Sequence, residues 1–472
     1  MTSQRDLAWQ KLELMNRASV AYQFARYALG FTYQSLPQDV VHQAKRCLLD
    51  ALGCAVGAYD APGRPICEDV ARELGGTKES TVIGSGLRTT APNATLVNSF
   101  MVRFLDYNDT GGGGHNSDSI PAIIAISERE KAGGSDFLTS LVISYELGAR
   151  VGESFRGGID AMDEKGMTTD MRGGLSMPCA LGRLMGLNES QIANAIGICA
   201  CSNIPLHVLD ADQEENTMRK NLRFGWVAYA AILSCMLARK GLTGPVRVVE
   251  GDGGWRQGIL RGEMDLERLI DFNGWRILKT VHKALAADGP LHGQLMATIA
   301  IVKENDLKPE DIASVRIKTG PHTFHHTTTP AKKYPKNAES ADHSAFYANA
   351  LAIKERGFGP DSIKPEKFTD PIVLDLIEKV TVELDSSFPG RGEGGTSEIT
   401  TKDGRRFEKR IDVPHGRGND PLTDGELEEK FREMAAKHMG ERQIKQIFDT
   451  IWNAEKLDNM GRLMKLMVFP SR

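Results

Sequence analysis

The chain has 472 residues, more than one small core requires, so we expect about two to three domains. Its content of 41% hydrophobic and 25% charged residues is ordinary for a soluble globular protein. The net charge of -4 argues against general nucleic-acid binding and polybasic membrane binding. A few local cations could still hold a small anionic substrate.

The cysteines and the N-terminus point to a reducing compartment. The seven cysteines are scattered, Cys199 and Cys201 being the closest pair, which fits neither zinc-ligand spacing nor a disulfide framework. We therefore expect buried free thiols. Residues 1–15 read as a polar helix without the apolar segment of a signal peptide. No apolar run reaches membrane-spanning length, so a cytoplasmic protein is expected.

Apolar spacing near 3.6 residues predicts a helical first part of the chain. The expected helices cover residues 14–29, 40–58, 93–105, 120–129, 136–155, 173–185, 189–201 and 224–239. Ser135 and Asn188 are natural N-caps for two of them. The strongly apolar segment 224–239 is expected to be a core helix.

The pattern changes after about residue 275. Alternation predicts strands over 312–319, 380–384, 398–401 and 406–411, with helices at 292–305 and 344–352 between them and at 424–438 and 444–451 after them. Lys402-Asp403-Gly404 forms a hairpin turn. We expect a mainly α protein: a large discontinuous helical domain of residues 1–275 and 416–472, and a smaller α+β lid domain of residues 276–415. Such an architecture favours a ligand cleft between domains.

One short stretch of the sequence contains several residues that could act as acid or base. Asp106 and Thr110 are followed by four glycines, Gly111 to Gly114, and then by His115. Successive glycines disfavour helix and strand, and one reason for them is close approach of the backbone to a ligand. An aspartate and a histidine within reach of one another make an acid–base set. The alternative is a flexible surface loop with a helix cap at residues 117–118.

A second candidate begins with the acidic run 210–215 and continues to Lys220 and Arg223, directly before the apolar helix. Cations anchored at such a junction suit carboxylate binding. The alternative is a solvated surface run of charges.

Two further candidates lie near the predicted domain boundary and beyond it. The first contains Lys283 and Asp288; the lysine could equally be solvent-exposed. The second is Ala341 to Tyr347, where Asp342 or Ser344 could merely cap the next helix.

Metal and nucleotide motifs are weak. His322, His325 and His326 lie together in a Thr/Pro-rich segment without a neighbouring carboxylate, which does not favour a metal site. The glycines of residues 392–395 lack the setting of a P-loop or a dinucleotide fingerprint.

Jointly these segments resemble the MmgE/PrpD family, which includes 2-methylcitrate dehydratase, cis-aconitate decarboxylase and iminodisuccinate epimerase. The matching segments, in the family's order, are Lys45–Gly53, Leu105–Thr110, His115–Asp118 with Ile120–Ile123, Lys220–Gly225, Leu242–Pro245 and Ala341–Ser344. The resemblance implies a helical domain with an α+β lid, a homodimer, and catalysis without a metal or an organic cofactor.

The resemblance also implies site residues. By position, Asp106, Thr110, His115, Lys220, Lys283 and Tyr347 fall on the family's motif. Arg223 stands where a histidine is frequent, and Asp288 stands where a histidine or cysteine is usual. Thr168 and Thr169 lie in a stretch that replaces a His-Pro-containing one. These departures bear on the substrate more than on the fold.

The expected chemistry is proton transfer at a carbon next to a carboxylate. Asp106 and His115 are the candidate base and acid, in either order, and Lys220, Lys283 and Arg223 supply cations for the developing charge. Thr110, Arg223, Asp288 and Tyr347 are the candidate substrate-binding residues. A dehydratase of a hydroxylated di- or tricarboxylate is the first hypothesis. A decarboxylase, an epimerase and a non-catalytic carboxylate-binding protein are the alternatives.

Overall fold

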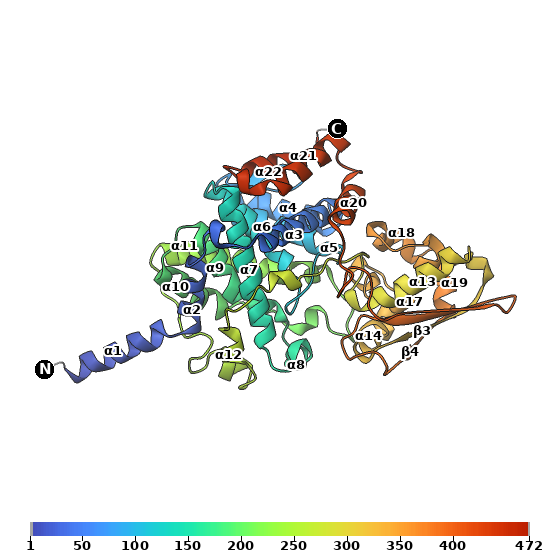
Figure 1. Ribbon diagram of the computed structural model, residues 1–472, viewed down its shortest axis with the longest axis horizontal. Helices are drawn as coiled ribbons and strands as arrows, with labels where there is room; N and C mark the ends of the chain where they lie inside the picture. The colour runs from blue at the N-terminus through green and yellow to red at the C-terminus, as the bar shows by residue number, and fades with distance from the viewer. Residues whose placement is uncertain (1–2, 471–472) are drawn as a thin grey trace.

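A computed structural model describes residues 3–470 of the chain (Figure 1). Within these residues the fold is mainly α-helical, with one two-stranded and one four-stranded sheet. The predicted fold class is confirmed. Helices occupy most of the molecule, and the four-stranded sheet lies at the end opposite the N-terminus (Figure 1).

The helical body is built from the first part of the chain and the C-terminal segment. Its helices are α1 (Gln4–Arg17), α2 (Val20–Leu29), α3 (Gln38–Gly57), α4 (Gly63–Leu74), α5 (Ala91–Phe104), α6 (Ile120–Arg129), α7 (Gly134–Ser154), α8 (Gly158–Glu164), α9 (Gly173–Leu184), α10 (Glu189–Ala200), α11 (Arg223–Arg239), α12 (Leu266–Leu269), α20 (Asp424–Ala435), α21 (Glu441–Trp452) and α22 (Gly461–Leu466). Strands β1 (Ser80–Thr81) and β2 (Arg88–Thr89) pair antiparallel. Helix α1 extends away from the body, and none of its residues is buried (Figure 1).

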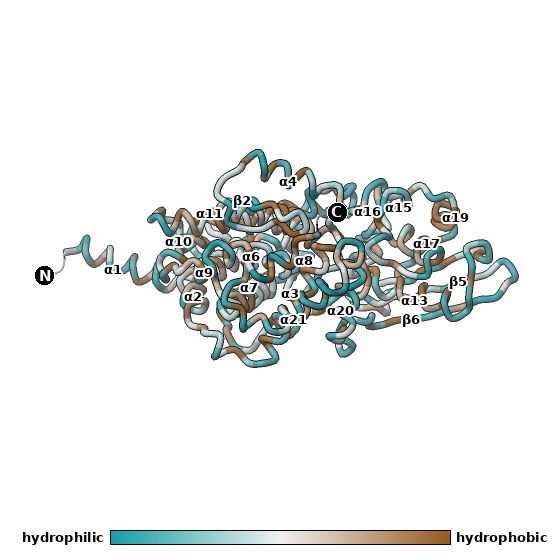
Figure 2. The backbone as a smooth tube through the Cα atoms, turned by 90° about the horizontal axis from the view of Figure 1, so that it is seen from above, coloured by the Kyte–Doolittle hydropathy of each residue, from teal (hydrophilic) through white to brown (hydrophobic). Residues whose placement is uncertain are grey.

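The remaining elements form the lid. They are α13 (His292–Glu304), β3 (Ile312–Thr319), α14 (Pro321–Thr327), α15 (Pro330–Lys333), α16 (Ala338–Ala341), α17 (Ala345–Glu355), α18 (Pro365–Phe368), α19 (Pro371–Lys379), β4 (Val380–Leu384), β5 (Gly395–Thr401) and β6 (Arg406–Ile411). Seen from above, the body and the lid follow one another along the long axis of the molecule (Figure 2). The exact domain boundaries stay a prediction.

The lid sheet has the strand order β4-β3-β5-β6. β3 runs parallel to β4 and antiparallel to β5, and β5 and β6 form the expected hairpin. Val315, Ile317 and Ile399 are buried on one face, where α13 packs against β5 and β6. Outward-facing residues alternate with them, as expected for a sheet covered by helices on one side.

Of three local predictions, one holds and two need correction or qualification. Helix α7 is capped by Gly133, whereas Ser135 Oγ donates a hydrogen bond to the Glu455 carbonyl. Asn188 caps α10 in a capping box, as predicted. The expectation of buried thiols holds for six of the seven cysteines, and Cys201 is exposed.

Helix α11 is only partly a core helix. With the turn before it, residues Met218–Arg239, it is long and apolar enough to span a membrane by length and composition, contrary to the sequence expectation. More than half of that segment, 56%, is buried inside the protein. It packs against α5, α9 and α10, as the helix of a globular core does. Its other face exposes Trp226, Leu233 and Leu237.

The C-terminal segment packs against the rest of the helical body, and the buried cation Lys430 links the two. Helix α20 packs against α3, and Lys430 Nζ lies 2.7 Å from an Asp50 carboxylate oxygen. The same ammonium donates to the main-chain oxygens of Tyr107 and Lys283, at 2.7 and 2.9 Å. Lys430 therefore joins α3, the segment after α5 and the start of the lid.

Lys430→Met should lower the free energy of unfolding by about 3–5 kcal/mol, because Asp50 is left buried without its cation. The matched control is Arg462→Met, which breaks the exposed pair between Arg462 and Asp458 and should cost at most about 1 kcal/mol. Thermal and denaturant unfolding followed by circular dichroism measure both. Equal effects of the two changes would contradict a structural role for Lys430.

Candidate active site

The site is built around Asp106, which ends helix α5. The C-cap of α5 is Leu105, and Asp106 follows with a left-handed backbone φ of 45°. Aspartate is one of the few residues besides glycine that tolerate this conformation, and such a residue commonly terminates a helix. The side chain is fully buried. Helix termination thus turns the carboxylate into the protein interior.

Three cations surround this carboxylate. Arg103 Nη1 lies 2.7 Å from Oδ1, Lys220 Nζ lies 3.0 Å from Oδ2, and Lys283 Nζ contacts Oδ1 and donates to the Asp106 main-chain oxygen at 2.8 Å. Burial alone would raise the pKa of Asp106, but Arg103, Lys283 and Lys220 hold that pKa well below its usual range. Asp106 is therefore a fixed anion that orders three cations, and a weak base.

The two lysines differ in their surroundings. Burial lowers the pKa of Lys220, but Asp342 and Asp106 raise it above the ordinary value. Lys220 therefore stays protonated and positively charged. Its Nζ lies 3.3 Å from both oxygens of Asp342. For Lys283 burial outweighs the carboxylates of Asp106 and Asp288, and its pKa is lowered. Lys283 therefore releases its proton more readily than Lys220.

His115 lies beside this group as a neutral base. Its Nε2 is 3.7 Å from Asp106 Oδ1. Burial, followed by the positive charges of Arg103 and Lys283, lowers the pKa of His115 well below its usual value. Its Nδ1 atom is buried and has no hydrogen-bond partner among the residues that the structure describes. A neutral imidazole with a free nitrogen is available as a proton acceptor, and the positive neighbours that lower its pKa also weaken it as a base.

Two of the four glycines before His115, Gly112 and Gly113, are explained by packing against α7. Gly111 to Gly114 all have positive φ, between 54° and 151°. A Cβ on Gly112 would lie 2.4 Å from Ala149 Cβ, and one on Gly113 would lie 2.8 Å from Gly152 Cα. The backbone therefore approaches helix α7 closely at these two glycines, and the predicted approach of this segment to a ligand stays a prediction.

Thr110 takes part in the site through its backbone. Its N–H and C=O exchange hydrogen bonds of 3.0 Å with Val281, which brings the segment carrying Lys283 beside the segment carrying Asp106. The sequence-based role in substrate binding rested on its side chain and stays a prediction.

Arg223 begins helix α11 and is held by two carboxylates. It pairs with Asp170, and its Nη1 lies 2.7 Å from Asp210 Oδ2. Burial opposes its charge, yet these two neighbours raise the pKa of Arg223. The acidic run from residue 210 is thus partly buried at the site, and its first member anchors a predicted substrate-binding cation.

The remaining predicted residues lie in different places. Asp288 comes to the cluster, with Oδ2 3.4 Å from His326 Nε2 and Oδ1 3.9 Å from His343 Nε2. Tyr347 lies in the lid core, where its hydroxyl donates to the Ser362 carbonyl at 2.6 Å and its ring packs edge-on against Phe368. Its predicted role in orienting the substrate is not supported by these contacts and stays a prediction.

Sequence reasoning missed several charged neighbours of Asp106. His343 Nε2 lies 3.7 Å from Asp106 Oδ2, and Asp342 contacts Lys220. Both lie in the candidate segment 341–347, but neither was named there as a site residue. Arg103 lies inside the apolar helix α5, three residues before its partner Asp106, and the sequence analysis did not single it out.

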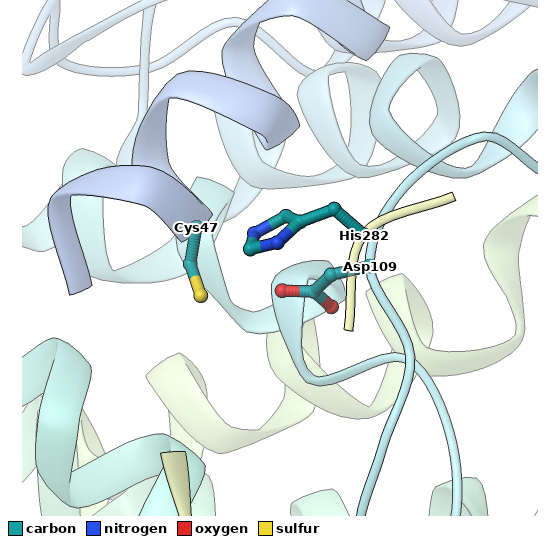
Figure 3. Close-up of side chains that lie close together, drawn as sticks. All are labelled: Cys47, Asp109 and His282. Carbon is teal, nitrogen blue, oxygen red and sulfur yellow. The ribbon is translucent and has the colours of Figure 1, made fainter. Parts of the chain in front are cut away.

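Behind the site lies a second buried group of Cys47, Asp109 and His282 (Figure 3). Asp109 accepts hydrogen bonds from Ser117 N, Ser117 Oγ and Tyr145 Oη. Burial raises the pKa of Asp109 to about 6 and lowers that of His282 to about 4. With three donors already on Asp109, we interpret this group as a support for the segments carrying Asp106 and Lys283.

The neutral state of His115 predicts a pH effect on stability. Its pKa in the folded protein lies below the value of about 6.5 in the unfolded chain, so the unfolded chain binds a proton first as pH falls. His115→Gln removes this group. Relative to the unchanged protein, the variant should therefore gain stability below about pH 6.5, by up to about 1.4 kcal/mol per pH unit.

Unfolding measured from pH 5 to 8 for both proteins gives this difference. The exposed His325→Gln is the matched control and should leave the pH profile unchanged. A stability difference between His115→Gln and the unchanged protein that is constant over this range would mean that His115 titrates normally.

Known proteins align with almost the whole chain. The MmgE/PrpD N-terminal domain matches residues 22–267, and the MmgE/PrpD C-terminal domain matches residues 286–454. A cis-aconitate decarboxylase-like protein of Aspergillus oryzae is 24% identical, over 92% of this chain and 94% of its own. Human cis-aconitate decarboxylase is 24% identical, over 96% and 95%. The 2-methylcitrate dehydratase of Salmonella typhi is 24% identical, over 91% and 92%. The chain belongs to the MmgE/PrpD family.

Proposed function

We propose that the protein is a lyase that removes water from a hydroxylated di- or tricarboxylate such as 2-methylcitrate. The observation that carries the proposal is the neutral His115 beside three cations ordered by Asp106. The similarity to 2-methylcitrate dehydratase supports this choice of reaction. Removing a proton next to a carboxylate needs a base and a stabilised negative charge, and the cluster offers both.

His115 is the base in this proposal. It takes the proton from the carbon next to a substrate carboxylate, and Lys220 stabilises the charge that develops on that carboxylate. Asp106 is a poor base because its pKa is held low, so its role is to position the cations. The proposal keeps His115 from the expected acid–base pair and gives Asp106 a positioning role.

Lys283 is the acid. Its lowered pKa favours transfer of a proton to the leaving hydroxyl, which departs as water as the carbon–oxygen bond breaks and the double bond forms. The imidazolium of His115 then returns its proton to the Lys283 amine. Protons balance over the cycle, and no oxidant or reductant is needed.

Access to these groups requires the body and the lid to separate. Asp106 and Lys220 are fully buried, and Lys220 is closed off by Asp342 and His343 from the lid. A carboxylate of the substrate can replace Asp342 at Lys220 when the lid opens. The described arrangement is therefore a closed state. In it, carboxylates of the protein pair with the cations that would bind the substrate.

Decarboxylation of a cis-aconitate-like acid is the second candidate. It is favoured by the names of several relatives, human cis-aconitate decarboxylase among them. The same residues would serve, with Lys283 delivering its proton to the carbon that loses carbon dioxide. Epimerisation of a dicarboxylate and simple carboxylate binding are further alternatives.

The test is a panel of citrate-like and aconitate-like acids followed by proton NMR in deuterated water, with parallel detection of alkene and carbon dioxide. Dehydration should give an unsaturated acid without carbon dioxide. His115→Ala should lower kcat by about two to four orders of magnitude. Carbon dioxide as a product would select the decarboxylase, and absence of both turnover and deuterium exchange would contradict an enzyme.

Lys220→Met and Lys283→Met separate the two lysine roles. Lys220→Met should weaken binding of a carboxylate inhibitor by about one to two orders of magnitude, because a charge-assisted hydrogen bond is lost. Lys283→Met should mainly lower kcat and shift the alkaline limb of its pH profile. A matched control is Lys465→Met on the distant helix α22, which should change neither quantity.

We also propose a homodimer in the cytoplasm. Trp226, Leu233 and Leu237 lie on one side of α11 at helical spacing and are 38–49% exposed. A second copy of the chain would cover such an apolar stripe by two-fold symmetry. The seven cysteines are all free thiols, six of them buried, which supports a reducing compartment.

The double change Trp226→Glu and Leu233→Glu should convert the dimer to a monomer, because it places four charges on a two-fold apolar contact. Light scattering coupled to gel filtration gives the mass. The paired control, Ile372→Glu on the exposed side of lid helix α19, should leave the mass unchanged. A monomeric unchanged protein would refute the proposal.

A further inference from the structure

Two histidines and two aspartates from four separate segments meet beside the Asp106 cluster. Asp210 precedes α11, Asp288 precedes α13, His326 lies on α14, and His343 lies between α16 and α17. We propose that these four side chains bind a divalent transition-metal ion of the zinc class. The proposal does not depend on which reaction the protein catalyses.

The spacing of the four groups is that of ligands around an ion. Asp210, His326 and His343 present ligand atoms within 4.8 Å of one another. His343 Nε2 lies 3.6 Å from Asp210 Oδ1, and His326 Nε2 lies 3.4 Å from Asp288 Oδ2. Two ligand atoms on one tetrahedral zinc ion, each about 2.0–2.2 Å from it, are roughly 3.3–3.6 Å apart. The separations of these two pairs match that value, and Asp288 Oδ1 lies 3.9 Å from His343 Nε2.

The same separations do not suit direct hydrogen bonds. A bond from an N–H group to a carboxylate oxygen measures about 2.7–3.2 Å. Asp210 Oδ1 and Asp288 Oδ2 are buried atoms without a hydrogen-bond donor among the described residues. Each faces the Nε2 atom of a histidine. A cation between them would satisfy both oxygens at once.

Both histidines are oriented as metal ligands are. His326 Nδ1 lies 2.6 Å from Asp212 Oδ1, and His343 Nδ1 lies 2.5 Å from Asp342 Oδ1. Lys220 also approaches His343 Nδ1, at 3.3 Å, so we assign the Nδ1 proton to the shorter contact with Asp342. A carboxylate that accepts from one imidazole nitrogen leaves the other free to bind a metal.

Charge and access favour a divalent ion. Two carboxylates together carry a charge of -2 that a divalent ion can share with Arg223, whose Nη1 lies 2.7 Å from Asp210 Oδ2. Imidazole with carboxylate ligands suits zinc and neighbouring transition metals better than calcium or magnesium. Asp210, Asp288 and His326 keep 11–16% of their side-chain surface exposed, which gives an ion a path to the site.

The test uses full-length protein without an affinity tag, first stripped with a chelator and then titrated with zinc by calorimetry. One zinc ion per chain should bind, and cobalt should give the visible spectrum of a site with nitrogen and oxygen ligands. Thermal unfolding should shift upward by roughly 2–3 °C at a zinc concentration of about 100 times Kd. Failure to bind zinc stoichiometrically would overturn the proposal and would favour the metal-free enzyme expected from the sequence.

Variants locate the ion. His326→Gln and His343→Gln should each abolish stoichiometric binding, and Asp212→Asn should weaken it by about 10–100-fold because His326 loses its orienting partner. The matched control is His322→Gln, which removes the ring stacked 5.4 Å from His326 and should leave binding intact. Cys201→Ser should also bind zinc, which excludes the exposed thiol.

Circular dichroism of each variant confirms that the chain is folded before binding is scored. Zinc bound equally well by His326→Gln and His343→Gln would place the ion elsewhere and overturn the proposal. A cobalt spectrum with strong sulfur-to-metal charge transfer would do the same, because the proposed site contains no thiolate. Both outcomes are independent of any activity measurement.

Discussion

The interior of this protein depends on one buried anion. Asp106 has no exposure to water, and a carboxylate in that position is stable only if cations replace its hydration. Arg103 comes from the helix that ends at Asp106, Lys220 from the turn before α11, and Lys283 from the start of the lid. The same ion cluster thus fixes three segments and gathers the groups that a carbon acid requires.

The support around the cluster follows from backbone constraints. Asp106 adopts a left-handed conformation where α5 must end, and Gly112 and Gly113 then let the chain pass within van der Waals contact of α7. The backbone bridge between Thr110 and Val281 aligns the segments of Asp106 and Lys283. Lys430 joins both segments to the C-terminal return. The site is therefore held from behind by main-chain contacts as well as by charges.

Around this support the charges form two groups of opposite character. On one side Arg103, Lys220 and Lys283 face Asp106 and lie near the neutral imidazole of His115. On the other side Asp210 and Asp288 face His326 and His343, with further carboxylates behind the histidine rings. The first group suits binding of an anion and the second suits binding of a cation.

The sequence by itself determined the helical character, the β3–β6 strands with their hairpin, and the segments that carry Asp106, His115, Lys220 and Lys283. Periodicity, turn residues and capping residues are local, so they are readable without a fold. The reason for Gly112 and Gly113 was not readable, because it lies in α7. Nor was the pairing of Asp210 and Asp288 with His326 and His343, since these residues are distant in the chain. Only the tertiary structure decided which charges are buried together, and burial sets which of them stay neutral, because desolvation acts on a group through its surroundings and not through its sequence neighbours.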